Sequence, residues 1–396
     1  MREFAIVGGG PSGALCGERL AEAGFRVTLF DEHPGWEKPC GGGLTYKAIQ
    51  AYPFLLDGPQ PKKLIRRVEL ISRRGERAWL DLDRPIVIYS RAVLNQLLLD
   101  RAARAGCTVV VSRVTQVNTA GSRVRLKFNG GEETADFVVL AGGARNSLLP
   151  GTTRLSPGDL ELTVGYFVPV QEDTLKLKFL HGFEGYLWSF PRSDHLSVGI
   201  CGKMGRTTSQ QLKEHLHAFL REEQIPLVGA RFYSHVLPSP GAATLRQRNV
   251  VGRNWALVGD AAAWVDPLTG EGLYYALRSG DLLAQAIAKG HPEEYPVRVR
   301  AEFSFELEFA AGIARHFYCR RFLGGDVTLR MIQFTRRSAT FRALMRDLFS
   351  GTQDYRSLKR RLWGQLGVTL TEIVASLLGG RPTFAEPPSV GSEPAR

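Results

Sequence analysis

Short apolar runs recur along this chain, and runs of this length bounded by glycine or acidic residues are typical of strands buried on both faces. They lie at 4–7, 26–30, 108–111, 137–141 and 255–258. A helical pattern over 91–106 ends on a glycine and leads into the third run. Buried strands that alternate with helices predict an α/β domain.

Other parts of the chain show alternating hydrophobicity, the pattern of strands with one buried face. It occupies 67–72, 78–82, 114–135 and most of 160–245, apart from a helical pattern near 208–223. From 297 to 380 the pattern is helical, and the Pro/Ser/Gly/Glu-rich tail is typical of disorder. We therefore predict an α/β domain with an inserted, mainly antiparallel β domain and a C-terminal helical region. The expected boundaries are 1–66, 90–158 and 246–292 for the first domain, 67–89 and 159–245 for the second, 293–381 for the helices and 382–396 for the tail.

The first apolar run enters a glycine-rich turn, Gly8-x-Gly10-x-x-Gly13, followed by a helical pattern. In a dinucleotide-binding turn the first glycine permits the sharp bend, the second lets a pyrophosphate approach the backbone, and the third lets helix and strand pack closely. The pyrophosphate then lies at the helix N-terminus. Asp31 and Glu32 end the second run, about 20 residues further on, where an acid can hold the ribose of adenosine. The α/β domain is therefore predicted to be a Rossmann-type FAD- or NAD-binding domain.

A second glycine-punctuated stretch lies far along the chain. The run at 255–258 ends on Gly259-Asp260, and a turn with Pro267 and Gly270 precedes a helix that opens at Gly272. An aspartate at a strand end can accept hydrogen bonds from two ribose-type hydroxyls, and a helix N-terminus can stabilise a flavin anion. This pairing points to FAD rather than NAD, although Gly259-Asp260 alone is also compatible with a helix N-cap.

Composition and charge narrow the function classes. The 51 Lys and Arg residues against 39 Asp and Glu give a formal net charge of +12, which favours an anionic partner. No zinc, helix-turn-helix or aromatic RNA-binding signature is present, so we expect no nucleic acid. The five scattered cysteines imply a reducing compartment and no cysteine-based metal site. Without an 18-residue apolar run or room for a signal peptide, the expected location is the cytoplasm or the cytoplasmic face of a membrane.

Two further segments complete a recognisable set: Lys38-Pro-Cys-Gly-Gly-Gly-Leu44 and Gly185-Tyr-Leu-Trp-Ser-Phe-Pro-Arg192. Together with the two glycine motifs they make residues 1–290 resemble the geranylgeranyl reductase family, which belongs to the p-hydroxybenzoate hydroxylase-like flavoproteins. The resemblance implies a non-covalent FAD and the reduction of carbon–carbon double bonds in isoprenoid chains. The glycine motifs are shared across the superfamily, whereas the two other segments are narrower.

The resemblance also implies roles for individual residues. Asp260 would bind the ribityl chain, Pro267, Gly270 and Gly272 would form the turn along the flavin ring, and Arg91 would reach the phosphate or ribose. The loop at Cys40 would lie by the isoalloxazine, although a flexible glycine connection is the alternative. The expected cofactor-binding residues are Gly8, Gly10, Pro11, Ser12, Gly13, Asp31, Glu32, Cys40, Gly41, Gly42, Arg91, Gly142, Gly259, Asp260, Pro267, Gly270 and Gly272.

Three aromatic residues, Tyr186, Trp188 and Phe190, alternate on an expected strand and so face one side of it. They form either an ordinary sheet core or the wall of a site for a long apolar chain, with Phe167 or Phe179 joining them if these face the same way. We take Cys40, Tyr186 and Trp188 as candidate catalytic residues. The candidates for a proton donor are Cys40, Tyr186 and His181.

One departure affects the electron donor. After the run at 137–141, many relatives carry an Asp-Gly pair that assists FAD and NADPH binding, and here the pair is Gly142-Gly143. A second dinucleotide turn is also missing, so the donor is left open between NADPH, reduced ferredoxin or another electron-transfer protein. A flavin monooxygenase or halogenase, a quinone-linked flavoprotein dehydrogenase and a non-catalytic flavin-binding or membrane-scaffold protein are the alternative functions. The Trp-x-Trp-x-Ile-Pro motif of halogenases is absent.

The C-terminal helical region carries basic clusters interleaved with apolar residues. The clusters are Arg320-Arg321, Arg336-Arg337 and Lys359-Arg360-Arg361, and the apolar neighbours are Phe322, Leu323, Phe334, Phe341, Leu362 and Trp363. Each basic residue near an anionic lipid surface contributes about 1 kcal/mol, so four or five support reversible attachment. This pattern predicts peripheral binding to an anionic membrane. The alternative is that these residues cover the protein's own core and a solvated face.

Overall fold

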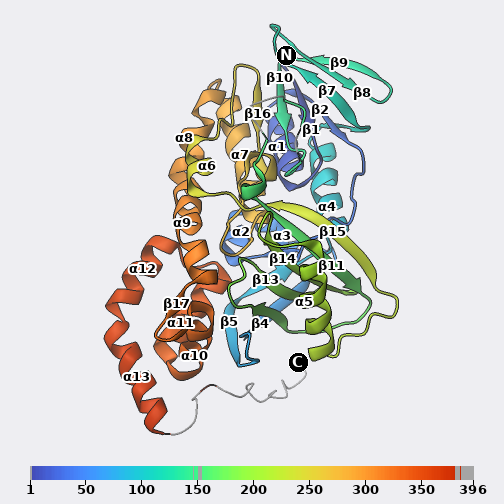
Figure 1. Ribbon diagram of the computed structural model, residues 1–396. Helices are drawn as coiled ribbons and strands as arrows, with labels where there is room; N and C mark the ends of the chain where they lie inside the picture. The colour runs from blue at the N-terminus through green and yellow to red at the C-terminus, as the bar shows by residue number, and fades with distance from the viewer. Residues whose placement is uncertain (1, 146, 150–153, 380–383, 385–396) are drawn as a thin grey trace.

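The computed structural model describes residues 2–145, 147–149, 154–379 and 384. One half of the molecule is built on a five-stranded parallel sheet in the order β16-β10-β1-β2-β6 (Figure 1). Its strands are β1 (Glu3–Val7), β2 (Arg26–Asp31), β6 (Thr108–Val111), β10 (Phe137–Leu140) and β16 (Trp255–Leu257). Three helices pack around it: α1 (Pro11–Glu22), α4 (Arg91–Arg104) and α7 (Leu273–Ala288).

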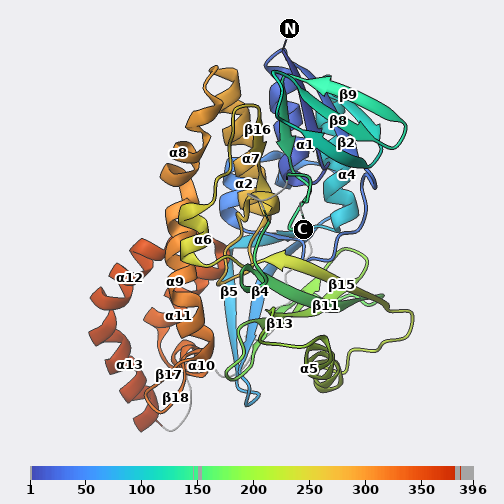
Figure 2. The same ribbon diagram turned by 45° about the horizontal axis from the view of Figure 1, so that its top comes forward.

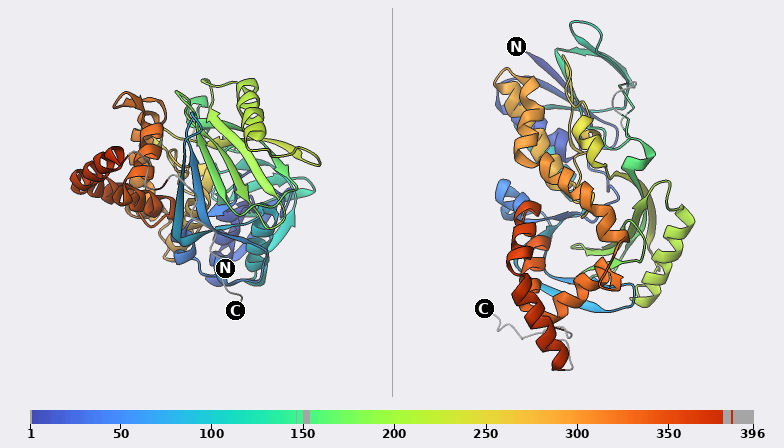
Figure 3. Two further views of the ribbon diagram at one scale, coloured as in Figure 1. Left: turned by 90° about the horizontal axis from the view of Figure 1, so that it is seen from below. Right: turned by 60° about the vertical axis from the view of Figure 1, so that its left-hand side comes forward.

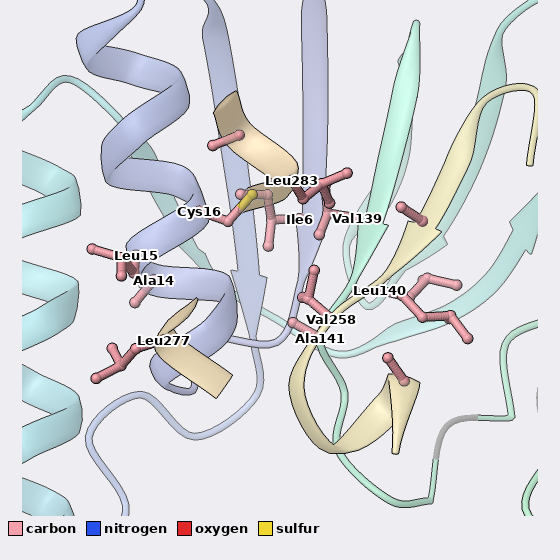
Figure 4. Packing of buried hydrophobic residues seen from close by; sticks show 14 of the residues in the cluster. Ile6, Ala14, Leu15, Cys16, Val139, Leu140, Ala141, Val258, Leu277 and Leu283 are labelled. Carbon is pink, nitrogen blue, oxygen red and sulfur yellow. The ribbon is translucent and has the colours of Figure 1, made fainter. Parts of the chain in front are cut away.

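The core of this half shows why the apolar runs form central strands. Ile6, Val139 and Leu140 are fully buried in one core with Leu15 and Cys16 of α1. Figure 4 shows Cys16 beside Ile6, whereas Leu140 lies on the other side of the sheet. Glycines set the spacing of the layers. A Cβ at Gly13 would lie 2.0 Å from the Gly8 carbonyl oxygen, and one at Gly280 of α7 would lie 2.2 Å from the Ser12 carbonyl oxygen. The start of α1 is thus clamped between β1 and α7.

The second half is an eight-stranded sheet in the order β15-β11-β14-β13-β12-β4-β5-β3, antiparallel except where β4 pairs with β12. Its strands are β3 (Gly43–Leu44), β4 (Lys63–Ile71), β5 (Arg77–Ile88), β11 (Leu160–Val168), β12 (Leu175–Phe179), β13 (Tyr186–Pro191), β14 (Leu196–Lys203) and β15 (Arg231–Pro238). Helix α5 (Ser209–Glu222), which begins at a Thr208–Gln211 capping box, covers its outer face (Figure 2). The opposite face looks toward the helices and the parallel sheet.

Smaller elements connect these parts. A three-stranded antiparallel sheet follows β6 and consists of β7 (Val114–Asn118), β8 (Val124–Phe128) and β9 (Gly131–Ala135). Short helices are α2 (Tyr46–Ala51), α3 (Phe54–Asp57) and α6 (Ala242–Gln247), with 3₁₀ turns at Pro157–Asp159, Gly259–Ala262 and Pro292–Glu294.

The C-terminal region forms a helical layer beside the eight-stranded sheet (Figures 1 and 3). It contains α8 (Tyr295–Val299), a π-helical turn (Arg300–Ser304), α9 (Phe305–Cys319), α10 (Val327–Arg337), α11 (Ala339–Ser350), α12 (Tyr355–Gly364) and α13 (Leu366–Leu378). Helices α10 and α11 pack against β5, whereas α12 and α13 lie outermost. A hairpin of β17 (Arg321–Phe322) and β18 (Gly325–Asp326) interrupts the helices.

The predicted fold class is confirmed, with differences in detail. Strands β4 and β5 are longer than the expected 67–72 and 78–82, because both continue toward β3, which follows Cys40. The β17–β18 hairpin was not expected inside the helical region. The expected tail from 382 lies outside the described residues, apart from Phe384.

Candidate active site

A cavity of about 470 Å³ lies where the two sheets face each other, a size that suits a small-molecule site. Both glycine motifs, the Cys40 loop and the aromatic strand contribute to its lining. Residues predicted for the site that line it are Gly8, Gly10, Pro11, Ser12, Asp31, Cys40, Gly41, Gly42, Arg91, Gly142, Tyr186, Trp188, Phe190, Asp260, Pro267, Gly270 and Gly272. The fold therefore brings together segments that are more than 200 residues apart in the sequence.

The turn between β1 and α1 forms one end of the cavity. Gly8 has a φ of +108° and Gly10 is the N-cap of α1 without a side-chain cap, so the first backbone N–H groups of the helix stay open to an anion. A Cβ at Gly10 would contact nothing within 4 Å, whereas Gly13 is packed against the backbone. Asp31 Oδ2 accepts the Gly9 N–H at 2.5 Å and so ties the end of β2 to the turn.

A buried cation marks the same end. Arg91, the first residue of α4, is 3% exposed, and its Nη2 donates to Asn95 Oδ1 at 3.2 Å. Within the described residues its Nε has no hydrogen-bond partner. An unpaired guanidinium N–H in a cavity is costly unless a ligand satisfies it. A phosphate or ribose oxygen of a dinucleotide fits this requirement.

Asp260, just after β16, is paired with Lys38 at 2.8 Å between Oδ2 and Nζ. Burial alone would raise the pKa of Asp260, but the positive charges of Lys38 and Arg91 hold it below its usual value. The carboxylate is therefore ionised and accepts hydrogen bonds. Nearby, burial and the Lys38 charge lower the pKa of His235 to about 4, so this imidazole is neutral at pH 7.

The turn before α7 is held from two sides. Tyr186 donates its hydroxyl hydrogen to the Thr269 carbonyl at 2.6 Å, and Tyr355 of α12 donates to Asp266 Oδ2 at 2.6 Å. Asp266 is 2% exposed and also accepts the Leu268 N–H at 2.8 Å. The β domain and the C-terminal helices thus fix the segment where the family resemblance places the flavin ring, and α7 begins at Leu273 with its N-terminus on the cavity.

The Cys40 loop is also rigid. The Cys40 carbonyl accepts hydrogen bonds from Arg192 Nη2 and, at 2.9 Å, from Ser197 Oγ. Arg192 is fully buried and pairs with Glu37. Gly42 has a φ of +81°, and a Cβ there would lie 2.1 Å from the Tyr89 carbonyl oxygen. This geometry does not fit a merely flexible connection.

The other end of the cavity is apolar. Tyr186, Trp188 and Phe190 share one face of β13, and the register continues that face onto β12. The indole of Trp188 lies over Gly199, where a Cβ would be 2.5 Å from its ring. The remaining apolar lining comes from Val68, Ile86, Leu175, Leu177 and Phe179 on the sheet and from Phe317, Met331, Leu348 and Phe349 on the C-terminal helices.

One carboxyl group on the cavity wall was missed by the sequence reasoning. Glu161 of β11 is 8% exposed and lines the cavity beside Thr163 and Cys201. Burial raises the pKa of Glu161, and the Lys203 charge only partly offsets this effect. Thr163 Oγ1 and Trp188 Nε1 have no hydrogen-bond partner among the described residues. The available signal was the spacing of Glu161 and Thr163, which puts two polar side chains on one strand face.

Several predicted residues are not on the cavity. Glu32 is exposed and lies 3.8 Å from Arg113, so only Asp31 of that pair faces the site. Gly13 and Gly259 act in packing; a Cβ at Gly259 would lie 2.6 Å from Ser12 Oγ. His181 lies outside the cavity and pairs with Asp326 at 2.6 Å. Phe179 joins the apolar wall, but Phe167 packs on Tyr233 instead.

Comparison with known proteins agrees with this site. Residues 6–50 match the family model described as an NAD(P)-binding Rossmann-like domain. The chain is 27% identical to geranylgeranyl diphosphate reductase of Nicotiana tabacum over 72% of its length, an alignment that spans 66% of the tobacco protein. It is 25% identical to digeranylgeranylglycerophospholipid reductase of Methanothrix thermoacetophila, over 72% of this chain and 77% of that one.

Solved structures give the same fold. A geranylgeranyl bacteriochlorophyll reductase-like protein of Thermoplasma acidophilum superposes with a TM-score of 0.73 at 20% identity, covering 92% of this chain and 98% of that one. The flavin-dependent brominase Bmp2 has a TM-score of 0.66 at 19% identity, covering 88% of this chain and 93% of that one. The relatives found by sequence are reductases, and the fold is one that flavin-dependent enzymes share. Within that class, the resemblance to the geranylgeranyl reductases is confirmed.

Proposed function

We propose that the protein is an FAD-dependent reductase that saturates carbon–carbon double bonds of an isoprenoid chain. The observation that carries the proposal is a single cavity that joins a dinucleotide-binding turn to a long apolar wall. One end offers open backbone N–H groups, Arg91 and Asp260, which suit the diphosphate and hydroxyls of FAD. The other end offers aromatic and aliphatic side chains, and burying an isoprenoid contributes about 0.8 kcal/mol per methylene.

The proposed cofactor contacts follow from the fit of the cavity. Gly10 and the N-terminus of α1 would hold the pyrophosphate with Arg91, Asp31 would hold the adenosine ribose, and Asp260 the ribityl hydroxyls. The Cys40 loop and the turn at 267–272 would flank the flavin ring. Reduced FAD supplies a hydride when bound. Asp260 would exchange its Lys38 partner, wholly or in part, for these hydroxyls.

An isolated alkene needs a proton on one carbon and a hydride on the other, which gives two new C–H bonds. We infer that Glu161 is the proton source, because its buried carboxyl keeps its proton at higher pH than an exposed one. Tyr186 already donates its hydrogen to the Thr269 carbonyl, which leaves it less available as an acid. The apolar wall excludes water, which would otherwise trap a developing cation.

The electron donor is left open between NADPH, reduced ferredoxin and another reductant. Gly142 and Gly143 have no carboxylate in the position where many relatives carry an aspartate. A chemical reductant therefore gives a donor-independent test of the half-reaction with substrate. The related lipid reductases and the apolar wall both favour a lipid-borne substrate, so we expect the protein to work at a membrane surface.

The decisive experiment identifies the flavin and the reduced product. The flavin released by denaturation should be FAD, and FMN would contradict the proposed diphosphate site. Dithionite-reduced protein should then reoxidise anaerobically on adding geranylgeranyl diphosphate or a digeranylgeranyl phospholipid. Mass spectrometry should show two added hydrogens per double bond.

The alternatives predict different outcomes of the same assay. Oxygen uptake with an oxygenated product would establish a monooxygenase, and halide incorporation a halogenase. Reoxidation by quinone analogues without alkene reduction would establish a quinone-linked dehydrogenase. A flavin that never cycles with any of these would indicate a non-catalytic binding protein.

A further inference from the structure

Helix α13 turns its polar side chains toward the protein and most of its apolar side chains toward solvent. The side chains it buries against the protein include Thr369 and Ser376, with Ile373 the only large apolar one. Its single charged residue, Glu372, also faces inward and accepts hydrogen bonds from the Ser338 hydroxyl and the Thr340 N–H. Apart from Thr371, the larger side chains on its solvent side are aliphatic: Leu366 at 42% exposure, Val368 at 56%, Leu370 at 44%, Val374 at 54%, Leu377 at 56% and Leu378 at 85%.

The apolar surface extends onto the preceding helix. Trp363 near the end of α12 is 70% exposed and Leu362 is 37% exposed. We call Leu362, Trp363 and the six exposed aliphatic residues of α13 the α13 face. Figures 1 and 3 show α12 and α13 as the outermost layer of the helical region. Contiguous exposed apolar surface of this kind marks a site of interaction with a membrane or a protein.

Cations flank this face. Lys359 and Arg360 of α12 are exposed, and no carboxylate of the described residues lies within ion-pair distance of either. Two other residues of the predicted basic clusters are neutralised within the protein, because Arg336 pairs with Glu76 at 3.0 Å and Arg361 with Asp347 at 2.9 Å. Phe334 and Phe341 pack edge-to-face on each other. The basic clusters therefore differ residue by residue in how much positive charge they leave unpaired.

We propose that the α13 face docks the protein onto an anionic lipid surface, with α13 lying in the interface. An aliphatic stripe, an interfacial tryptophan and neighbouring unpaired cations are the combination that binds such surfaces. In the part of the chain that the structure describes, no helix is long and apolar enough to cross a bilayer. At 13 residues, α13 is about 20 Å long, which suits a helix lying in the plane of the membrane.

The position of this face deepens the proposed function. Gly351, Gln353 and Tyr355, which join α11 to α12 and open α12, are among the residues that line the cavity. Helix α12, with 10 residues and a length of about 15 Å, therefore connects the α13 face to the cavity wall. A polyprenyl chain held at the α13 face would reach the site by covering the length of this helix.

The test is binding of the full chain to vesicles of phosphatidylcholine with and without phosphatidylglycerol. We expect binding to anionic vesicles, and the double variant Leu370→Glu/Val374→Glu should weaken it by more than about tenfold. Val297→Glu is the matched control, because Val297 is an exposed helical valine on α8, at the other end of the helical region in Figure 1. Its binding should equal wild type. Lys359→Glu/Arg360→Glu should cost roughly fivefold per cation and respond to salt.

A second readout locates the contact. Lipids brominated on their acyl chains should quench the Trp363 emission, and Trp363→Phe should remove that component. Equal vesicle binding by the glutamate variant and wild type would overturn the proposal. Absence of binding, together with a dimer that the glutamate variant dissociates in sedimentation velocity, would assign the face to a second copy instead.

Activity on two substrates separates this proposal from the proposed reaction. The glutamate variant should reduce soluble geranylgeranyl diphosphate at the wild-type rate but lose activity on a digeranylgeranyl phospholipid in vesicles. Loss of neither would overturn the docking proposal alone. Failure of wild type on both substrates, despite vesicle binding, would overturn the reaction alone.

Discussion

The two ends of the cavity are built by different means. The end proposed for the cofactor is shaped mainly by backbone, at Gly8, Gly10 and Gly42, together with a few charged groups such as Arg91 and Asp260. The end proposed for the substrate is made of side chains whose positions depend on the register of an eight-stranded sheet. The difference teaches that a local motif can specify one end, whereas the other emerges only when distant strands pair.

Glu161 is a buried carboxyl group among the apolar side chains at the proposed substrate end. Replacing it is expected to have the largest effect on activity. We expect Glu161→Gln to lower turnover roughly 10²–10⁴-fold, the usual contribution of a general acid, with unchanged flavin affinity. Because burial raises the pKa of Glu161 and the protonated form donates, wild-type activity should fall as pH rises through that pKa. The pH profile of single-turnover flavin reoxidation checks this.

The alkaline limb of that profile should disappear in Glu161→Gln. The control is Glu69→Gln, which removes a buried carboxylate of the same sheet that pairs with Arg77 away from the cavity. Equal pH profiles for wild type and Glu161→Gln would assign the proton to another group.

Two glycine variants test whether the backbone of the β1–α1 turn binds the pyrophosphate of FAD, as proposed. Gly10→Ala places a Cβ where no protein atom lies within 4 Å. The free energy of unfolding should therefore change by at most about 1 kcal/mol, the size of a helix-cap effect. Two lost pyrophosphate hydrogen bonds would still weaken FAD binding roughly a hundredfold. Gly13→Ala meets the Gly8 carbonyl and should lower both stability and affinity. Thermal unfolding and flavin titration separate these effects, and normal FAD binding by Gly10→Ala would place the pyrophosphate elsewhere.

Removing the charge at the cofactor end should have a smaller effect. Asp260→Ala loses charge-assisted hydrogen bonds worth about 1.5–3 kcal/mol, which corresponds to roughly ten- to a hundredfold weaker FAD binding. Lys38→Met should not reproduce this loss if the ribityl chain is the main partner of Asp260. A similar loss in both variants would instead make the Lys38–Asp260 pair a structural bridge.

The smallest effect is expected from a substitution in the aromatic face of β13. Trp188→Phe keeps an aromatic ring but removes contact area, so KM for the isoprenoid should rise up to about tenfold with FAD affinity unchanged. Steady-state kinetics and flavin titration give the two numbers. A change in FAD affinity without a change in KM would assign Trp188 to the cofactor end of the cavity instead.

The sequence predicted the fold class, and most of the residues it proposed for the cofactor line one cavity, because strand, turn, helix and acid follow each other within about 30 residues. It did not predict Glu161, Arg192 or the Tyr355–Asp266 hydrogen bond, since each acts on a segment tens to hundreds of residues away. The placement of His181 failed for the same reason: nothing local shows that its strand end points toward Asp326. The orientation of α13 was not predicted either, because the sequence analysis considered only the basic clusters and their immediate apolar neighbours.

The glycine beneath Trp188 has a consequence for the length of chain that the proposed substrate site could accept. A side chain at Gly199 would lie 2.5 Å from the indole and 2.7 Å from the Tyr233 hydroxyl, so it would tip the ring upward. The depth of the cavity available to a chain is then set by Gly199 beneath the aromatic residues as much as by the aromatic residues themselves. The residue at position 199 would therefore limit the length of the bound chain, and relatives that differ at this position should differ in how many isoprene units they accept.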